Sequence, residues 1–235
     1  MLKLPFLSKK SYFCRKQNIT LFLMEMIFIQ LASSLFNMPA ASAELRQNAP
    51  LQHINVVNWE QFDYRPQVTF RAGWNEQGLL IDFQVEEQHI LSSHTELHAP
   101  AYKDSCVEFF YSPTSDNSYY NLEMSCTGAR LWHHKTADGQ KTTFEGPDLE
   151  KIVIATTLPA HTLIDDRNGG KWGLTVFIPA ECLPEGFLVS GRQFTANFYK
   201  CGDDTMQKHY LTWAPIPTEK PSFHQPAYFG KITLQ

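Results

Sequence analysis

The stretch that decides the fold is 103–111, Lys-Asp-Ser-Cys-Val-Glu-Phe-Phe-Tyr, followed by 119–124, Tyr-Tyr-Asn-Leu-Glu-Met. Both segments are rich in aromatic residues, which favour β-strands. The residues between them (112–118), Ser-Pro-Thr-Ser-Asp-Asn-Ser, have the composition of a turn. The two segments therefore predict a β-hairpin.

Side chains alternate between the two faces of a strand, so the hairpin has an apolar and a polar face. If the apolar faces are buried together, Glu108, Asn121 and Glu123 project from the same side of the sheet. Carboxylate and amide groups on one face could hold a polyhydroxylated ligand, because both hydrogen-bond to hydroxyls. An ordinary solvated face is the competing interpretation.

Strand patterns continue along the chain, and helical periodicity is weak apart from one turn at 179–183. We expect an all-β fold, an antiparallel two-sheet β-sandwich. The loops at 86–104, 135–150, 159–171 and 214–229 are long, and long loops on a rigid scaffold tend to carry function. The further strands are expected at 68–72, 79–85, 129–134, 151–158, 172–178, 193–200, 208–213 and 230–234.

The first 43 residues have the pattern of an export leader. A basic start precedes a largely apolar stretch (19–36), and Ala41-Ser42-Ala43 is a small-x-small cleavage pattern before Glu44. This predicts a signal peptide over 1–43, a single domain over 44–235, and a periplasmic or extracellular location. An uncleaved membrane anchor is the alternative, which Glu25 makes costly.

Charge excludes some classes of partner. The chain has a net charge of −4, and the leader carries five basic residues and one acidic residue, so its removal leaves a more acidic domain. Nucleic acids and anionic membrane surfaces need clustered Lys and Arg, so neither is an expected partner.

Four cysteines follow the leader, and they allow either two disulfides or buried free thiols. In the hairpin, Cys106 and Cys126 fall on opposite faces, which disfavours a bond between those two. No spacing of Cys and His indicates a zinc site. The neighbours His133 and His134 point apart, and the pairs Asp165-Asp166 and Asp203-Asp204 could bind calcium or lie in solvated turns. The other two cysteines are Cys182 and Cys201.

The segment 102–110 with 119–123, and the ending 211–213 with 223–232 (Phe-His-Gln-Pro-Ala-Tyr-Phe-Gly-Lys-Ile), resemble family 9 carbohydrate-binding modules. The order of elements matches over most of 50–235. The resemblance implies a β-sandwich that binds sugar without catalysis, serves carbohydrate breakdown, and works beside glycan-degrading enzymes. It also implies structural calcium, for which the sequence does not identify ligands.

The resemblance also implies site residues. The family glutamate falls on Glu108, and the two tryptophans that clamp the sugar fall on Tyr102 and Phe223. The family's polar pair falls on Asn121 and Glu123. Beside Phe223, His224 could donate to a sugar hydroxyl. The alternatives are packing of Tyr102 on the sheet edge and Phe223 as a plug under its loop.

The sequence leaves two other functions open. Glu108 and Glu123, if directly opposite on neighbouring strands, could lie at the separation of a retaining glycosidase, giving a hydrolase of O-glycosyl bonds. A haem-binding electron-transfer sandwich would need Met124 or Met206 with a histidine as iron ligands.

Overall fold

The computed structural model describes residues 24–235. The basic start of the predicted leader lies outside the described residues. Residues 24–235 form sixteen strands, two short α-helices and three 3-10 turns. The strands before the hairpin are β1 (Glu25–Gln30), β2 (Gln52–His53), β3 (Val56–Val57), β4 (Gln67–Asn75), β5 (Gly78–Glu87) and β6 (Ile90–Ser92).

The remaining elements follow the expected order, with additional short strands inside the predicted loops. The strands are β7 (Cys106–Ser112), β8 (Tyr119–Ser125), β9 (Arg130–Lys135), β10 (Lys141–Thr143), β11 (Val153–Thr156), β12 (Ile164–Asp166), β13 (Gly170–Pro179), β14 (Gln193–Cys201), β15 (Tyr210–Thr212) and β16 (Gly230–Leu234). The helices are α1 (Met38–Asn48) and α2 (Pro147–Glu150), and the 3-10 turns are η1 (Ala101–Lys103), η2 (Ala180–Cys182) and η3 (Pro226–Tyr228).

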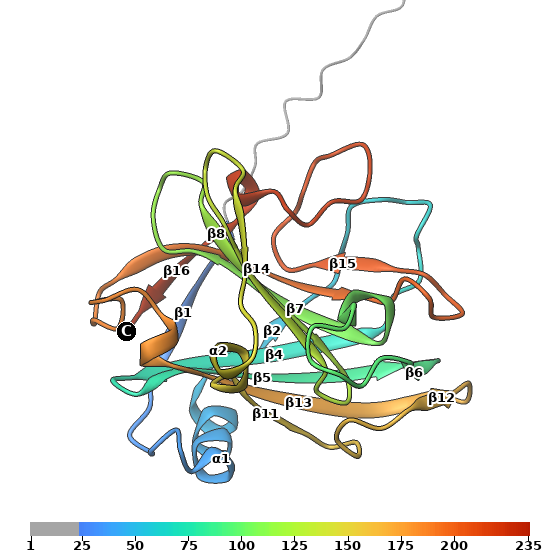
Figure 1. Ribbon diagram of the computed structural model, residues 1–235, viewed down its shortest axis with the longest axis horizontal. Coiled ribbons are helices and arrows are strands. Elements are labelled where there is room, and N and C mark those ends of the chain that lie inside the picture. Colours follow the sequence, from blue (N-terminus) through green and yellow to red (C-terminus); the bar gives the residue numbers. More distant parts are fainter. Residues whose placement is uncertain (1–23) are drawn as a thin grey trace, which may run out of the picture.

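The strands form two layers that face each other as a β-sandwich (Figure 1). One layer has the order β10-β9-β8-β7-β14-β16, and the other has the order β4-β5-β13-β11. Strand β1 joins them, because its first half pairs with β16 and its second half with β4. Both pairings of β1 are parallel, so the expectation of an antiparallel sandwich is confirmed except at this one strand.

Aromatic side chains fill the space between the layers. Phe198 of β14 stacks on Phe70 of β4 with ring centroids 4.0 Å apart, and on Phe109 of β7 at 5.0 Å. Trp172 and Trp213 are both buried in this core. The hairpin of β7 and β8 sends its apolar face into the core, so its polar face lies on the outside of the sandwich.

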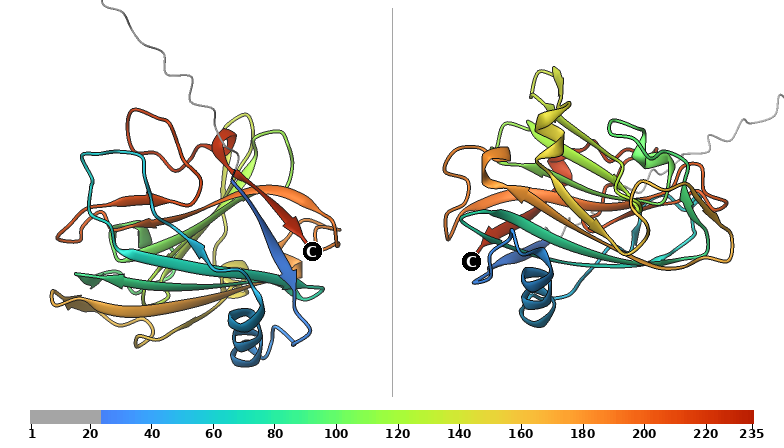
Figure 2. Two further views of the ribbon diagram at one scale, coloured as in Figure 1. Left: turned by 180° about the vertical axis from the view of Figure 1, so that it is seen from behind. Right: turned by 60° about the horizontal axis from the view of Figure 1, so that its bottom comes forward.

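Residues that the sequence assigned to the leader form part of this fold. Phe28 of β1 is fully buried and lies against Phe194 with ring centroids 5.8 Å apart. The helix α1 covers the outer face of the second layer, where Leu45 is fully buried together with Leu80 and Phe177 (Figure 2). A cut after Ala43 would remove β1 and divide α1.

Polar contacts and close packing hold α1 in place. Arg46 donates two hydrogen bonds to the buried Asp82, at 2.7 and 3.0 Å. A Cβ on Gly73 would lie 2.9 Å from Cδ1 of Leu45 and 3.0 Å from the backbone oxygen of Ile29, so a larger residue there would force these neighbours to shift. The apolar side chains of β1 and α1 therefore pack within the sandwich. Cleavage after Ala43 stays a prediction, and its structural consequence is the loss of these contacts.

Within residues 24–235, no helix has the length and apolar character needed to cross a membrane.

Candidate functional site

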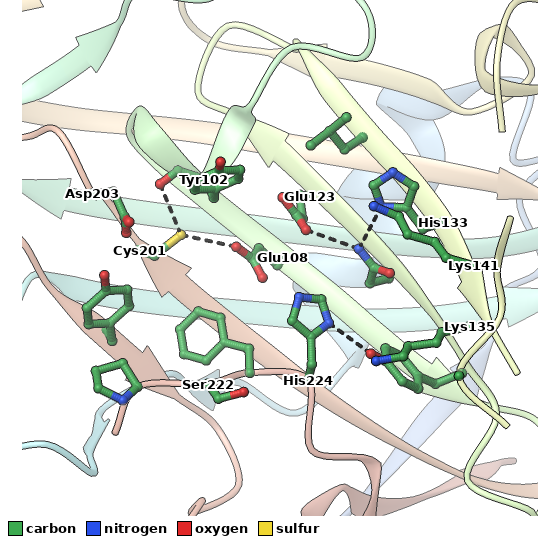
Figure 3. Close-up of a pocket in the computed structure, with 17 residues that line it drawn as sticks. Tyr102, Glu108, Glu123, His133, Lys135, Lys141, Cys201, Asp203, Ser222 and His224 are labelled. Atoms are coloured by element: carbon green, nitrogen blue, oxygen red, sulfur yellow. Dashed lines mark hydrogen bonds between the residues drawn. The ribbon is translucent and has the colours of Figure 1, made fainter. Parts of the chain in front are cut away.

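A pocket of about 660 Å³ lies on the outer face of the layer that contains the hairpin. Its floor comes from β7, β8, β9 and β14, and its walls come from η1 and the segment 221–224 (Figure 3). The volume falls in the range of sites for small organic ligands. All six residues singled out in the sequence line this pocket: Tyr102, Glu108, Asn121, Glu123, Phe223 and His224.

Strand register brings the polar groups of the floor together. Glu108 of β7 lies directly opposite Glu123 of β8, and Asn121 lies directly opposite His133 of β9. The alternation of side chains then places all four on one face. The sequence predicted that Glu108, Asn121 and Glu123 share a side. They are almost completely buried rather than on a solvated face.

Glu108 is the deepest carboxyl group of the pocket, with 2% of its surface exposed. The thiol of Cys201 donates to its Oε1 at 3.1 Å. Burial, with added repulsion from Cys201 and Glu123, raises the pKa of Glu108 well above its ordinary value. A neutral carboxylic acid can both donate and accept, so Glu108 suits a ligand that carries vicinal hydroxyls.

Glu123 keeps one oxygen free for a ligand. Its Oε1 accepts a hydrogen bond of 3.0 Å from Asn121, whereas its buried Oε2 has no partner within residues 24–235. A buried polar atom without a partner carries a free-energy penalty, which a ligand hydroxyl would remove. Burial raises the pKa of Glu123 to about 7. Asn121 also contacts Nδ1 of His133 at 3.3 Å, so the amide positions Glu123.

The two aromatic residues of the predicted clamp differ in exposure. Tyr102 is 39% exposed, and in Figure 3 it lies on the opposite side of Glu108 from Ser222 and His224. Phe223 is only 9% exposed, since one face of its ring stacks on Tyr199 with centroids 4.1 Å apart. Phe223 therefore combines packing under its loop with a share of the pocket wall, and Tyr102 is the open ring.

Two histidines complete the wall in the neutral form. Burial, followed by the charges of Lys135 and Lys141, lowers the pKa of His224 to about 4. Its Nδ1 lies 2.9 Å from the hydroxyl of Tyr119. When that hydroxyl donates, Nε2 carries the proton and can donate into the pocket. Burial also lowers the pKa of His133 to about 4.

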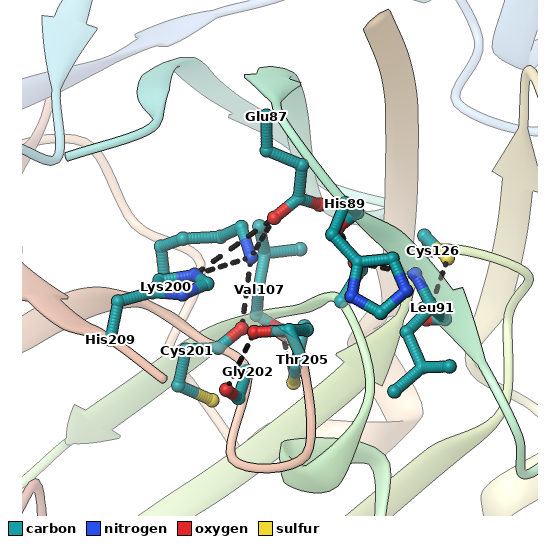
Figure 4. Close-up of polar contacts among 12 residues, drawn as sticks. Glu87, His89, Leu91, Val107, Cys126, Lys200, Cys201, Gly202, Thr205 and His209 are labelled. Atoms are coloured by element: carbon teal, nitrogen blue, oxygen red, sulfur yellow. Dashed lines mark hydrogen bonds and ion pairs between the residues drawn. The ribbon is translucent and has the colours of Figure 1, made fainter. Parts of the chain in front are cut away.

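A buried ion pair holds β14 from behind the floor (Figure 4). Nζ of Lys200 lies 2.8 Å from Glu87 of the other layer and donates to Nε2 of His209 at 2.9 Å. Burial lowers the pKa of His209 well below its ordinary value, so the ring stays neutral and accepts this bond. The indole of Trp172 donates to Glu87 at 2.7 Å. The pair joins the two layers next to Cys201.

All four cysteines that the structure describes are free and buried, so the disulfide interpretation is wrong for this structure. Cys106 and Cys201 face each other across β7 and β14, and their thiols lie with Glu108 within 4.8 Å of one another. Burial raises the pKa of Cys106 to about 12, which keeps this thiol protonated. Two thiols and one carboxyl are not the oxygen-rich donor set that calcium prefers.

The aspartates considered for calcium pair with cations of the protein. Asp165 contacts His89 at 2.8 Å and Arg167 at 3.2 Å, and Asp203 contacts Lys208 at 3.2 Å. Both carboxylates are therefore engaged by basic side chains of the protein, and calcium binding stays a prediction. The haem hypothesis finds no support, because Met124 is buried in the apolar core and Met206 does not line the pocket.

Sequence reasoning missed the part of the site that depends on strand pairing. Cys201 lies in the floor of the pocket because it pairs with Cys106 of β7. Lys135 lines the pocket because it pairs with Tyr119 of β8. His133 lines the pocket while His134 stacks on Tyr120 on the opposite face, with ring centroids 4.4 Å apart. The alternation at 133–134 was visible in the sequence, but the side on which the ligand pocket lies was not.

One family model and several solved structures match this chain. The family model for "Carbohydrate-binding family 9" matches residues 40–234. A candidate carbohydrate-binding protein from Bacteroides uniformis superposes with a TM-score of 0.84 at 27% identity, covering 91% of this chain and 100% of that one. A family 9 module from Caldicellulosiruptor kristjanssonii is similar in its glucose complex (TM-score 0.55, 14% identity, 90% of this chain and 96% of that one).

The cellotriose complex of the Caldicellulosiruptor kristjanssonii module is similar to the same degree, with a TM-score of 0.54 at 14% identity, covering 90% of this chain and 94% of that one. At this identity the likeness supports the sandwich fold. No curated protein matches the chain. The family match over nearly the whole domain, together with the pocket of carboxyl, amide and aromatic groups, leads to one assignment: the chain belongs to carbohydrate-binding family 9.

Proposed function

We propose that this pocket binds a sugar ring of a mono- or oligosaccharide without cleaving it. The observation that carries the proposal is the floor, where two buried carboxyl groups lie opposite each other and Oε2 of Glu123 has no protein partner within residues 24–235. Ring hydroxyls would hydrogen-bond to Glu108, Glu123 and Nε2 of His224. Tyr102 and the free part of Phe223 would contact the apolar faces of the ring.

Energetics require both kinds of contact. If each aromatic ring covers about 50 Å² of sugar, two rings contribute about 2–3 kcal/mol at about 25 cal/mol per Å². Association opposes this with at least about 4 kcal/mol, so stacking alone does not give useful affinity. Hydrogen bonds between neutral groups add about 0.5–1.5 kcal/mol each, and several of them complete the site. The glucose and cellotriose complexes of the Caldicellulosiruptor kristjanssonii module support a sugar ligand.

The biological setting follows as part of the proposal. A sugar-binding domain of this kind would capture glycans for breakdown, next to glycan-degrading enzymes and outside the cytoplasm. A processing site that leaves the sandwich complete would lie before Met24, because β1 and α1 both belong to the fold.

Calorimetry against a panel of mono- and oligosaccharides tests the proposal. We expect Glu108→Gln to weaken binding by about tenfold or more, since both oxygens of the carboxyl group can accept a hydrogen bond whereas the amide nitrogen can only donate. Glu76→Gln, at an exposed glutamate in the turn between β4 and β5, is the matched control and should bind like the parent chain. Equal affinity of Glu108→Gln and the parent chain would remove this pocket from sugar binding. Cleavage of a chromogenic glycoside that disappears in Glu123→Gln would favour the hydrolase instead.

A further inference from the structure

Two lysines face each other at one end of the pocket. Lys135 of β9 and Lys141 of β10 are directly opposite in the strand register, and both line the pocket. In Figure 3 they lie on one side of the site, beside His133 and His224, while Asp203 lies on the other side. The pocket is therefore basic at one end and acidic at the other.

Neither lysine of this pair forms an ion pair within residues 24–235. Like charges directly opposite on neighbouring strands destabilise a sheet. Neither Lys135 nor Lys141 lies within 4.0 Å of a described carboxylate, whereas every other described lysine except Lys220 does. Lys220 directly precedes Pro221, which lines the same pocket. Two of the three unpaired lysines thus line this site.

Their charge reaches the interior of the pocket. Lys141 contributes to the lowered pKa of His133 and of His224, and it opposes the rise in the pKa of Glu123. A ligand placed among these three side chains therefore meets a positive field at its Lys141 end. The negative charge of the carboxyl groups opposes this positive field only weakly, because burial favours the neutral forms of Glu108 and Glu123.

We infer that the pocket selects an acidic saccharide, a hexuronic acid whose carboxylate lies between Lys135 and Lys141 while its ring hydroxyls lie on Glu108 and Glu123. The inference rests on the proposed function and deepens it by naming the ligand class. The anionic group supplies the missing counter-charge for both ammonium groups, each of which offers three donors. A neutral sugar would fill the same floor and leave the two lysines in mutual repulsion.

Matched pairs of sugars give the sharpest test, because a hexose and its hexuronic acid differ only at C6. The affinity of the full chain is measured by calorimetry at low salt for glucose against glucuronate, galactose against galacturonate, and mannose against mannuronate. Two exposed ion pairs contribute up to about 1 kcal/mol each, so in the pair that fits the pocket we expect the uronate to bind about three- to tenfold more tightly. The difference should shrink at about 1 M salt, where the screening length is about 3 Å.

Variants locate the effect. The double variant Lys135→Gln with Lys141→Gln should bind the uronate no more tightly than the matching neutral hexose. Lys171→Gln, at an exposed lysine on the other layer that pairs with Glu86, changes the net charge without touching the pocket and should keep the preference. The two lysines form no ion pair and repel each other across the strands, so the double variant should be at least as stable to heat as the parent chain.

The outcomes separate this inference from the proposed function. Equal binding of the hexose and the uronate, or an unchanged preference in the double variant, would overturn the acidic-saccharide inference and leave sugar binding standing. Failure of both members of every pair, and of the oligosaccharide panel, would overturn both.

Discussion

Glu123 combines burial, a raised pKa and an oxygen without a described partner, and this combination has a consequence for stability. Its pKa is about 7 in the folded chain against an ordinary value of 4.5. The folded state therefore binds this proton more tightly than the unfolded state does. The protonated carboxyl group stabilises the fold fully below about pH 4.5, and this stabilisation is lost as the pH rises through about 7. Glu108 shifts in the same direction.

We expect Glu123→Gln to unfold like the parent chain near pH 4.5 and to be more stable than the parent at pH 8, by on the order of 2–3 kcal/mol. The amide is neutral at both pH values, so it lacks the penalty of a buried carboxylate. His133 and His224 have lowered pKa values and act in the opposite sense, because their contribution is lost as the pH falls from about 6.5 toward 4. Urea unfolding at several pH values, with Glu76→Gln as the control, isolates the glutamate. A parallel pH dependence of parent and variant would contradict the assigned pKa.

At the level of residues, the sequence predicted the features that depend only on neighbouring residues in the chain. The alternation of side chains along a strand placed Glu108, Asn121 and Glu123 on one side, as the structure shows. Burial of Phe223 on Tyr199 was not visible, because it depends on a loop that folds back over β14. The contact between Cys201 and Glu108 likewise depends on pairing between strands distant in the sequence.

At the level of elements, β1 and α1 are the largest departure from the expected organisation. An apolar strand followed by a helix with small residues has the same composition as an export leader with a small-x-small cleavage pattern. What distinguishes them is pairing of β1 with β16 and β4, and a sequence pattern carries no information on such distant partners.

A chain that starts at Glu44 should therefore be less stable than a chain that starts at Met24. Phe28, Leu31 and Leu35 are at most 3% exposed, and burial of each such side chain contributes about 1.5–3 kcal/mol. The whole stability of a domain is about 5–15 kcal/mol, so we expect the chain that starts at Glu44 to melt at least about 10 °C lower than the chain that starts at Met24, or to lack a cooperative transition. Scanning calorimetry on both chains decides this. Identical melting temperatures would mean that β1 and α1 contribute nothing to the sandwich.

The long loops foreseen in the sequence supply most of the variable part of the pocket. The loop at 86–104 brings Tyr102, the loop at 135–150 brings Lys141, and the loop at 214–229 brings Phe223 and His224. The loop at 159–171 lines none of it. The expectation that loops on a rigid scaffold carry the site was thus useful, but which loops meet at one face depends on the strand order.

At the level of the whole molecule, the two faces of the layer that contains the hairpin have different roles. The inner face packs on the other layer through stacked aromatic rings, and the Lys200–Glu87 ion pair ties the layers together near the pocket. The outer face carries the carboxyl groups under the loops. The sandwich could be predicted because it follows from strand patterns. The depth of the pocket could not, since it is set by loops that no local pattern places.

A crystal structure of the chain soaked with the tightest-binding sugar of the matched panel is the most direct measurement. We expect a sugar ring beside Tyr102, with hydroxyls within hydrogen-bond distance of Glu108 and Oε2 of Glu123. Density for the sugar elsewhere on the molecule, with the pocket over Glu108 and Glu123 empty at saturating ligand, would contradict it.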